Sequence, residues 1–113
     1  MTKTRSLRSS ESFECFVLDQ LAELGPVSAR KMFGGVGLYC GDVFFGIIAR
    51  DELYLKVDDS TRDRYERAGM HPFKPYPDRP TTMKYYGVPL EVLESSVELT
   101  RWAHDAVASA GRK

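Results

Sequence analysis

Apolar residues near the start of the chain recur at three- and four-residue intervals, the period of a helix with one buried face. These residues are Phe13, Phe16, Val17, Leu21 and Leu24. Gly25 and Pro26 follow, and together they end helices, because glycine adopts the left-handed cap conformation and proline lacks an N–H donor. The pattern predicts a first helix over residues 10–24.

After this helix the pattern changes to short apolar runs separated by turn residues, which is typical of antiparallel strands. Residues 36–40 and 43–49 flank Gly41-Asp42, a dipeptide that favours a tight hairpin turn. A third run follows at residues 53–57, and residues 27–32 form either a further strand or an extended lead-in. The sequence therefore predicts a hairpin that a third strand extends.

The strand register decides which side chains share a face, because successive side chains point to opposite sides of a sheet. A three-residue loop before residues 53–57 predicts one apolar face that packs on helices. Its members are Val36, Leu38, Val43, Phe45, Ile47, Ala49, Leu53, Leu55 and Val57. The opposite face, with Gly37 across from Gly46, would carry Gly35, Gly37, Tyr39, Phe44, Gly46, Ile48, Tyr54 and Lys56. Strand glycines either admit close approach by another molecule or mark bulges, and both interpretations stay open.

The second half of the chain begins with a helical segment. Ser60 and Asp63 have the spacing of a capping box, and Gly69 is placed to end the helix. The arginines of this helix are expected in solvent. A proline-rich connection over residues 72–80 then leads to a further strand at residues 82–86.

The chain closes with a short helical turn at Pro89 and a longer helix with an apolar stripe. The stripe consists of Leu99, Trp102, Ala103, Ala106, Val107 and Ala110. The element order is α-β-β-β-α-β-(β)-α, without the alternation that builds parallel sheets. This order predicts an α+β two-layer sandwich over residues 10–113, preceded by a flexible tail at residues 1–9.

Length and charge narrow the function classes. A chain of 113 residues with 42% hydrophobic content fits one domain with one core. Its 16 Lys and Arg residues balance 16 Asp and Glu residues, so we do not expect the isolated domain to bind nucleic acid directly. No apolar run is long enough to span a membrane, and no signal peptide is recognisable. We expect a soluble cytoplasmic protein.

Residues capable of catalysis or metal binding are few. Cys15 and Cys40 are the two cysteines, and neither has the spacing of a metal site or a disulfide framework. His71 lies in the proline-rich connection and His104 on the polar side of the last helix, so neither pairs with a nucleophile. The sequence predicts no catalytic residues, no metal, no cofactor and no enzymatic activity.

Three separated motifs carry a resemblance to a known family. They are residues 32–39 (MFGGVGLY), 53–58 (LYLKVD) and 83–89 (MKYYGVP), and the likeness extends from the first helix to the last. The chain resembles the TfoX N-terminal domain family, named for a bacterial regulator of competence genes. The resemblance implies a secretion-chaperone-like α+β fold, with helices on one face of a curved antiparallel sheet, and a homodimer. It also implies a link to transcriptional co-activation, here as a stand-alone module.

The leading hypothesis is a non-enzymatic regulatory or protein-interaction module that binds an unknown protein partner. Its contact set is the glycine-bearing face described above or an exposed sheet edge. A second hypothesis is a small-ligand or anion site formed by Arg30, Lys31 and Lys56 over that face. A third is direct DNA binding, which would show a steep dependence on salt.

Overall fold

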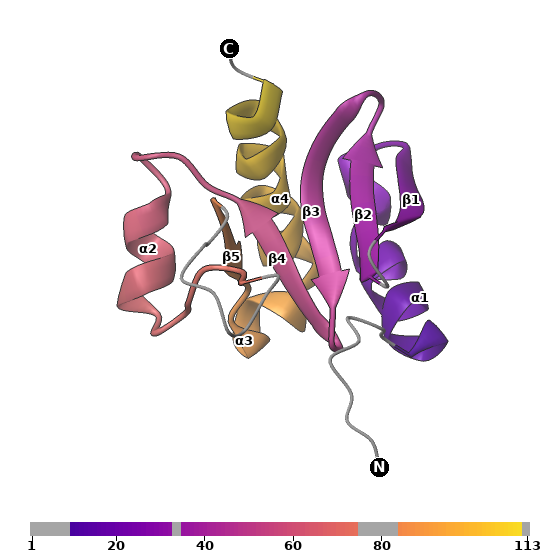
Figure 1. Cartoon of the computed structure of the whole chain (residues 1–113), viewed down its shortest axis with the longest axis horizontal. Helices are drawn as coiled ribbons and strands as arrows, with labels where there is room; N and C mark the ends of the chain where they lie inside the picture. Colours follow the sequence, from indigo (N-terminus) through magenta and orange to yellow (C-terminus); the bar gives the residue numbers. More distant parts are fainter. Residues whose placement is uncertain (1–9, 33–34, 75–83, 112–113) are drawn as a thin grey trace.

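The computed structural model describes residues 10–32, 35–74 and 84–111. Helices and strands follow one another in roughly the order that the sequence predicts, with one additional strand near the start (Figure 1). In chain order they are α1 (Glu11–Gln20), the 3-10 turn η1 (Ala22–Leu24), β1 (Val27–Met32), β2 (Gly35–Cys40), β3 (Val43–Ala49), β4 (Glu52–Lys56), α2 (Arg62–Arg67), β5 (Tyr85–Gly87), α3 (Leu90–Leu93) and α4 (Ser96–Gly111). The segment at 27–32 is thus a strand and not a lead-in.

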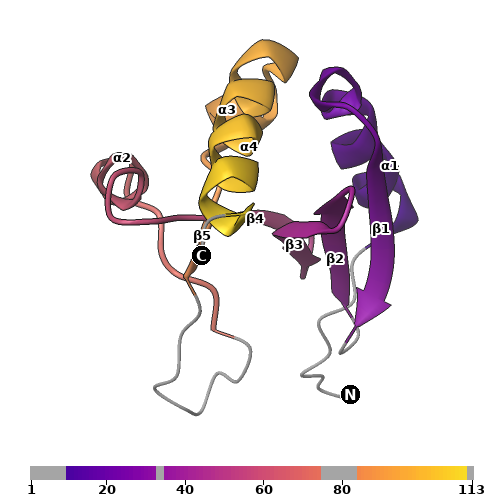
Figure 2. The same ribbon diagram turned by 90° about the horizontal axis from the view of Figure 1, so that it is seen from above.

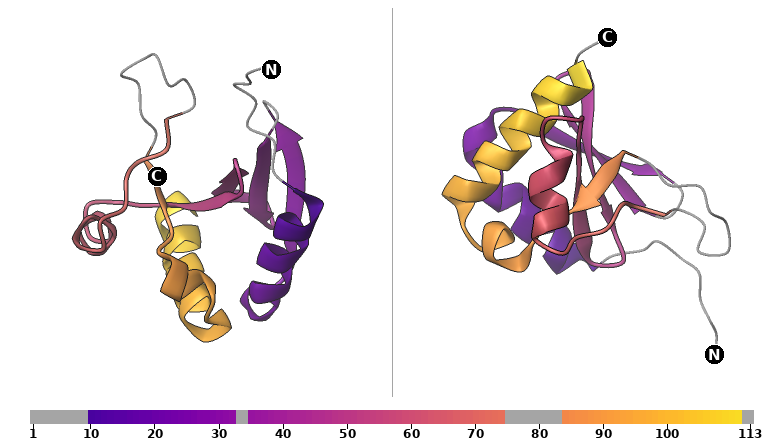
Figure 3. Two further views of the ribbon diagram at one scale, coloured as in Figure 1. Left: turned by 90° about the horizontal axis from the view of Figure 1, so that it is seen from below. Right: turned by 90° about the vertical axis from the view of Figure 1, so that its left-hand side faces the viewer.

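The five strands form one antiparallel sheet in the order β1-β2-β3-β4-β5. Helices α1, α3 and α4 lie on the same side of this sheet (Figures 2 and 3), and α4 packs on β3 and β4. No described helix covers the other side, which we call the open face. The predicted α+β two-layer architecture is confirmed.

The main core lies between the sheet and the helices. Its fully buried side chains include Leu38 and Phe45 from the sheet, Val17 from α1 and Leu99 from α4, each 0% exposed. Ala103 and Ala106 continue the contact along α4. The helical stripe predicted from the sequence is therefore the surface that docks α4 on the sheet.

The predicted faces of β3 are wrong in part. Ile48 pairs with Leu53 and lies in the core under the helices, whereas Ile47 and Ala49 lie on the open face. One cause is the β3–β4 connection: Ala49 pairs with Glu52, so the loop has two residues, Arg50 and Asp51, and not three. Both have positive φ angles, 53° and 59°, the backbone of a tight hairpin turn with the sheet's own twist.

A β-bulge between Leu38 and Tyr39 shifts the register of β2 against β3. Leu38 pairs with Gly46 and Tyr39 pairs with Phe44, so Phe45 is the extra residue. A bulge of this kind leaves one residue unpaired and lets neighbouring side chains depart from strict alternation. Phe44 and Phe45 lie on opposite faces, as in a regular strand, but Phe45 and Gly46 both lie on the helix side. The residues that follow, 47–49, therefore have their faces exchanged relative to the prediction.

The caps of α1 and α2 show which helix signals were correct. Ser10 is the N-cap of α1, and its Oγ accepts a hydrogen bond from the Phe13 N–H at 3.2 Å. At the end of α2, Gly69 has φ +80° and the Met70 N–H donates to the Tyr65 carbonyl, a Schellman cap. The predicted capping box of Ser60 and Asp63 is wrong, because Thr61 is the N-cap residue.

Residues 71–74 border β5. The Phe73 N–H donates to the Tyr85 carbonyl at 2.7 Å, the Gly87 N–H donates to the His71 carbonyl at 3.1 Å, and Pro72 forms a bridge with Tyr86. The strand predicted at residues 82–86 is observed as β5, and residues 82–83 lie outside the described part. One edge of the sheet is thus occupied by the chain itself.

Candidate interaction surface on the open face

Aromatic side chains form a continuous row across the open face. The Arg30 guanidinium lies 4.8 Å from the centre of the Tyr39 ring, and this ring stacks on Phe44 with centroids 5.2 Å apart. Phe44 in turn contacts Tyr85 at 5.3 Å. We call Arg30, Tyr39, Phe44 and Tyr85 the aromatic row. It joins β1, β2, β3 and β5, so it is a property of the assembled sheet.

The strand register explains how Arg30 reaches Tyr39. Arg30 pairs directly with Gly37, and Tyr39 is the diagonal neighbour two residues further along β2. Because Gly37 has no side chain, the position opposite Arg30 is left open and the guanidinium can lie over the neighbouring ring. Gly37 was predicted to permit close approach by another molecule. In the structure, the group that uses this space is the Arg30 side chain of the same sheet.

One end of the aromatic row is sealed and the other is accessible. Tyr85 is 6% exposed, its hydroxyl donates to the Phe44 carbonyl at 3.2 Å, and burial raises its pKa to about 12. Tyr39 and Phe44 are half-buried, and Arg30 is exposed. A partner would therefore meet the Arg30 end, while Tyr85 anchors the row in the sheet.

Tyr54 and Phe73 form a second aromatic pair on the open face, with ring centroids 4.9 Å apart. The Tyr54 hydroxyl donates to Glu52 Oε1 at 2.6 Å. Burial, followed by this hydrogen bond, raises the pKa of Tyr54. Tyr54 thus remains neutral and helps to close the β4 side of the face.

The three predicted cations do not converge on one site. Arg30 lies on the open face, but its neighbour Lys31 pairs with Val36 and so belongs to the helix side of β1. Lys56 pairs with Tyr85 and returns to the open face, with β2 and β3 between β4 and β1. A single anion pocket formed by all three is therefore not present.

Two residues of the predicted contact set lie on the wrong face. Gly46 and Ile48 are buried under the helices, and Gly46 pairs with Leu38 instead of Gly37. A Cβ atom at Gly46 would meet Leu38 Cδ1 and the Tyr54 carbonyl oxygen, each at 3.3 Å. Gly46 is thus required for close packing inside the protein. Gly35 pairs with Met32 at the far end of β2.

A second surface, around Trp102 of α4, was not predicted from the sequence. Arg64, expected in solvent, places its guanidinium 4.6 Å from the Trp102 ring centre and 2.8 Å from Asp105 Oδ2. Tyr65 meets the same indole edge-on at 4.7 Å. A shallow groove of about 510 Å³ lies beside Arg64 and Trp102, and its lining includes Glu98, Thr100 and His104 of α4. The contact joins α2 to α4, which amphipathic spacing within one helix could not reveal.

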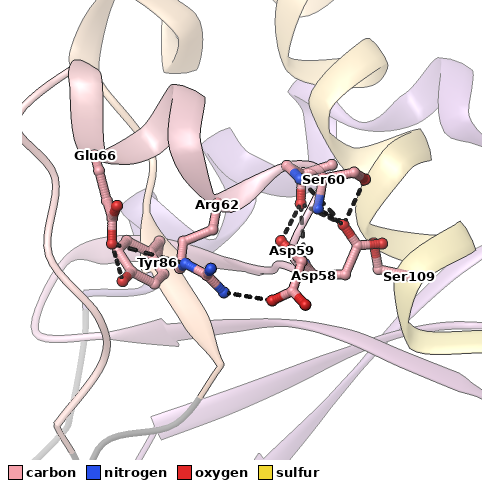
Figure 4. Close-up of polar contacts among 8 residues, drawn as sticks. Asp58, Asp59, Ser60, Arg62, Glu66, Tyr86 and Ser109 are labelled. Carbon is pink, nitrogen blue, oxygen red and sulfur yellow. Dashed lines mark hydrogen bonds and ion pairs between the residues drawn. The ribbon is translucent and has the colours of Figure 1, made fainter.

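Asp58 organises the connection between β4 and α2 (Figure 4). Its Oδ1 accepts from the Ser60 N–H, the Ser60 hydroxyl and the Thr61 N–H, and its Oδ2 accepts from the Ser109 hydroxyl of α4 at 2.8 Å. The side-chain hydrogen bonds from Ser60 and Ser109 hold the pKa of Asp58 well below its usual range. Asp58 thus holds the turn that leads into α2, where the sequence predicted a capping box of Ser60 and Asp63, and it ties α4 to the same turn.

The remaining titratable candidates are separate from one another. Cys15 is exposed on α1, Cys40 is partly buried on β2, and both are free thiols. His71 and His104 are exposed. Over residues 10–32, 35–74 and 84–111, no group of three His, Cys, Asp or Glu residues is arranged to hold a metal ion. Within the same residues no helix has the length and apolar character needed to cross a membrane.

Comparison with known proteins places these features in a family. The model of the TfoX N-terminal domain matches residues 19–110. The DNA transformation protein TfoX1 of Aliivibrio fischeri (strain ATCC 700601 / ES114) is 36% identical over 52 residues, which are 46% of this chain. The match spans 25% of that relative's length. Because the family match takes in all five strands, helices α2 and α3 and nearly all of α4, the chain belongs to the TfoX N-terminal domain family.

Proposed function

We propose that this chain is a non-enzymatic regulatory module that binds a protein partner through the accessible end of the aromatic row. The observation that carries the proposal is the stack of Arg30 on Tyr39 and of Tyr39 on Phe44, on a sheet face that no described helix covers. The proposed process is the control of competence genes. The name of the Aliivibrio fischeri relative, a DNA transformation protein, supports this link.

The composition of the accessible end favours a protein partner. Tyrosine and arginine are among the residue types most enriched where binding energy concentrates at protein interfaces. Tyr39 offers a large contact area with few rotatable bonds, and Arg30 is already held over its ring, so little side-chain entropy is lost on binding. Since Lys31 and Lys56 lie away from Arg30, the three cations do not combine into one anion site on this surface.

Photocrosslinking tests the proposal in living cells. A benzophenone amino acid at position 39 should yield a covalent adduct whose protein component is identified by mass spectrometry. The matched control is the same probe at Val97, which is 66% exposed on the helix side of the molecule. An adduct at position 39 that is absent at position 97 is expected.

The partner so identified is then purified and titrated against three variants. Arg30→Ser and Tyr39→Ser should each raise the dissociation constant about tenfold, a loss of affinity typical of a central interface residue. Val97→Ser should bind like the parent. If both open-face variants bind as tightly as the parent, the assignment of this surface is wrong. If the chain instead binds duplex DNA, with an affinity that falls steeply as the salt concentration rises, the partner is a nucleic acid and not a protein.

A further inference from the structure

The two edges of the sheet differ in what covers them. Residues 71–73 hydrogen-bond along β5, whereas β1 pairs with β2 alone among the described strands and lies at the edge of the sheet in Figure 2. Ser28, Ala29, Arg30 and Lys31 are all exposed. Ala29 pairs with Leu38 and so faces the helix side, yet it is exposed, which shows that α1 does not cover this part of the edge.

An uncovered edge strand is a template for another strand, because alternate N–H and C=O groups point away from the sheet. Natural edges are often guarded by charges, and β1 carries Arg30 and Lys31. These charges oppose pairing most strongly where they would lie opposite like charges. Pro26, immediately before β1, lacks an N–H and limits any added ladder to the residues that follow it. The edge thus admits a short strand of suitable charge.

A second copy of β1 fits this edge in one register. In an antiparallel pair related by a two-fold axis, opposite residues must point to the same face, so the axis passes through a single residue position. With the axis at Ala29, Ser28 faces Arg30 and Val27 faces Lys31 of the other copy. With the axis at Arg30 or Lys31, two like charges would lie directly opposite, which is destabilising. An axis at Val27 or Ser28 would place Pro26, which lacks an N–H, inside the ladder. The register centred on Ala29 pairs residues 27–31 and puts no two like charges directly opposite.

The same register brings opposite charges together on the helix side. Lys31 of one copy would lie beside Val27 of the other, and exposed Glu23 precedes that strand in η1. The flanking helix α1 carries Glu14 and Asp19 and has no Lys or Arg between residues 11 and 20. A basic strand end therefore approaches an acidic region of the second copy.

We propose that β1 pairs with β1 of a second copy of this chain, antiparallel and centred on Ala29, to form one continuous sheet. Both helix layers then lie on one side, and both open faces lie on the other, with the two Arg30 residues flanking the seam. This inference goes beyond the proposed function and does not rest on it, since the dimer uses the backbone edge of β1 and partner binding uses the aromatic row.

Disulfide trapping tests the register directly. In a background with Cys15→Ser and Cys40→Ala, the variant Ala29→Cys should give a covalently linked dimer under mild oxidation. Residues facing each other across an antiparallel pair have Cα atoms about 4.5–5.5 Å apart, within reach of a disulfide. The matched control is Ser28→Cys, whose two copies would lie beyond about 7 Å and should not link. A mixture of Ser28→Cys with Arg30→Cys should link across the pair.

Charge reversal gives a second readout that needs no oxidation. Light scattering after size-exclusion chromatography, over a range of concentrations, should show a dimer for the parent. Lys31→Glu should weaken the dimer roughly tenfold through two symmetric contacts, and Glu23→Lys combined with Lys31→Glu should restore it. A parent that stays monomeric at all concentrations overturns the proposal, and Arg30→Cys linking to itself overturns the register. Either result leaves the binding test at Tyr39 standing, because that test uses a different partner.

Discussion

The two faces of the sheet both carry apolar side chains but are used differently. The helix side places Phe45 and Leu38 at 0% exposure against α1 and α4. The open face places Phe44 and Tyr39 in a stack that stays half-buried and ends at an exposed arginine. Apolar character alone therefore does not decide which face becomes the core. The turn after β3 and the bulge at Phe45 within β3 decide it.

The neighbours Phe44 and Phe45 offer the largest test of this difference. Phe45→Ala should lower the free energy of unfolding by about 3–5 kcal/mol, because it leaves a cavity in the closed core. Phe44→Ala should cost only about 1–2 kcal/mol, since it removes half-buried area and one stacked pair. Urea unfolding followed by circular dichroism measures both. Equal losses would mean that the open face is packed as tightly as the helix side.

Two glycines sharpen the same comparison with a smaller effect. Gly46→Ala should destabilise the protein by about 1–2 kcal/mol, because the added methyl group meets the Tyr54 carbonyl, a backbone atom that cannot move aside. Gly87→Ala is the matched control. Its nearest neighbour is Met70 Cε at 3.2 Å, the end of a flexible side chain, so its stability should change by less than about 0.5 kcal/mol. Thermal unfolding of the two variants is compared with that of the parent. If Gly46→Ala left the stability unchanged, Gly46 would not be packed against β4 on the helix side.

The sequence predicted well those elements that local signals define. Ser10 before the first apolar period and Gly69 after α2 mark helix ends through their own backbone preferences. The faces of β3 depended instead on Arg50 and Asp51. Neither residue is a glycine, and their positive φ angles leave no strong signal in the sequence. A loop one residue shorter than expected, together with the extra residue Phe45 in β3, reversed the faces of Ile47, Ile48 and Ala49.

The candidate site was predictable as residues but not as contacts. Arg30, Tyr39 and Phe44 were each singled out, yet their stacking depends on the pairing of three strands and on the bulge. The Trp102 surface was missed because Arg64 belongs to a different helix, and the pattern within α4 shows only that Trp102 is apolar. Long-range pairing supplies this information, and a single sequence contains little of it.

The smallest predicted effect concerns the sealed end of the aromatic row. Tyr85→Phe should cost about 1 kcal/mol at neutral pH, because it removes the hydrogen bond to the Phe44 carbonyl. Burial raises the pKa of Tyr85 to about 12 in the folded protein, above the value near 10 of an unfolded tyrosine. Its contribution is therefore fully present below about pH 10 and is lost as the pH rises toward 12. The variant has no phenol to ionise at this position.

The deficit of Tyr85→Phe relative to the parent should consequently shrink between about pH 10 and 12, as measured by urea unfolding at each pH. The other buried tyrosines, Tyr54 and Tyr65, titrate in both proteins, so the difference isolates Tyr85. If the stability difference between the two proteins stays constant across this range, the Tyr85 hydroxyl is accessible to water, as the Arg30 side chain is. The whole row would then be an accessible surface, and a partner could contact it from β1 to β5.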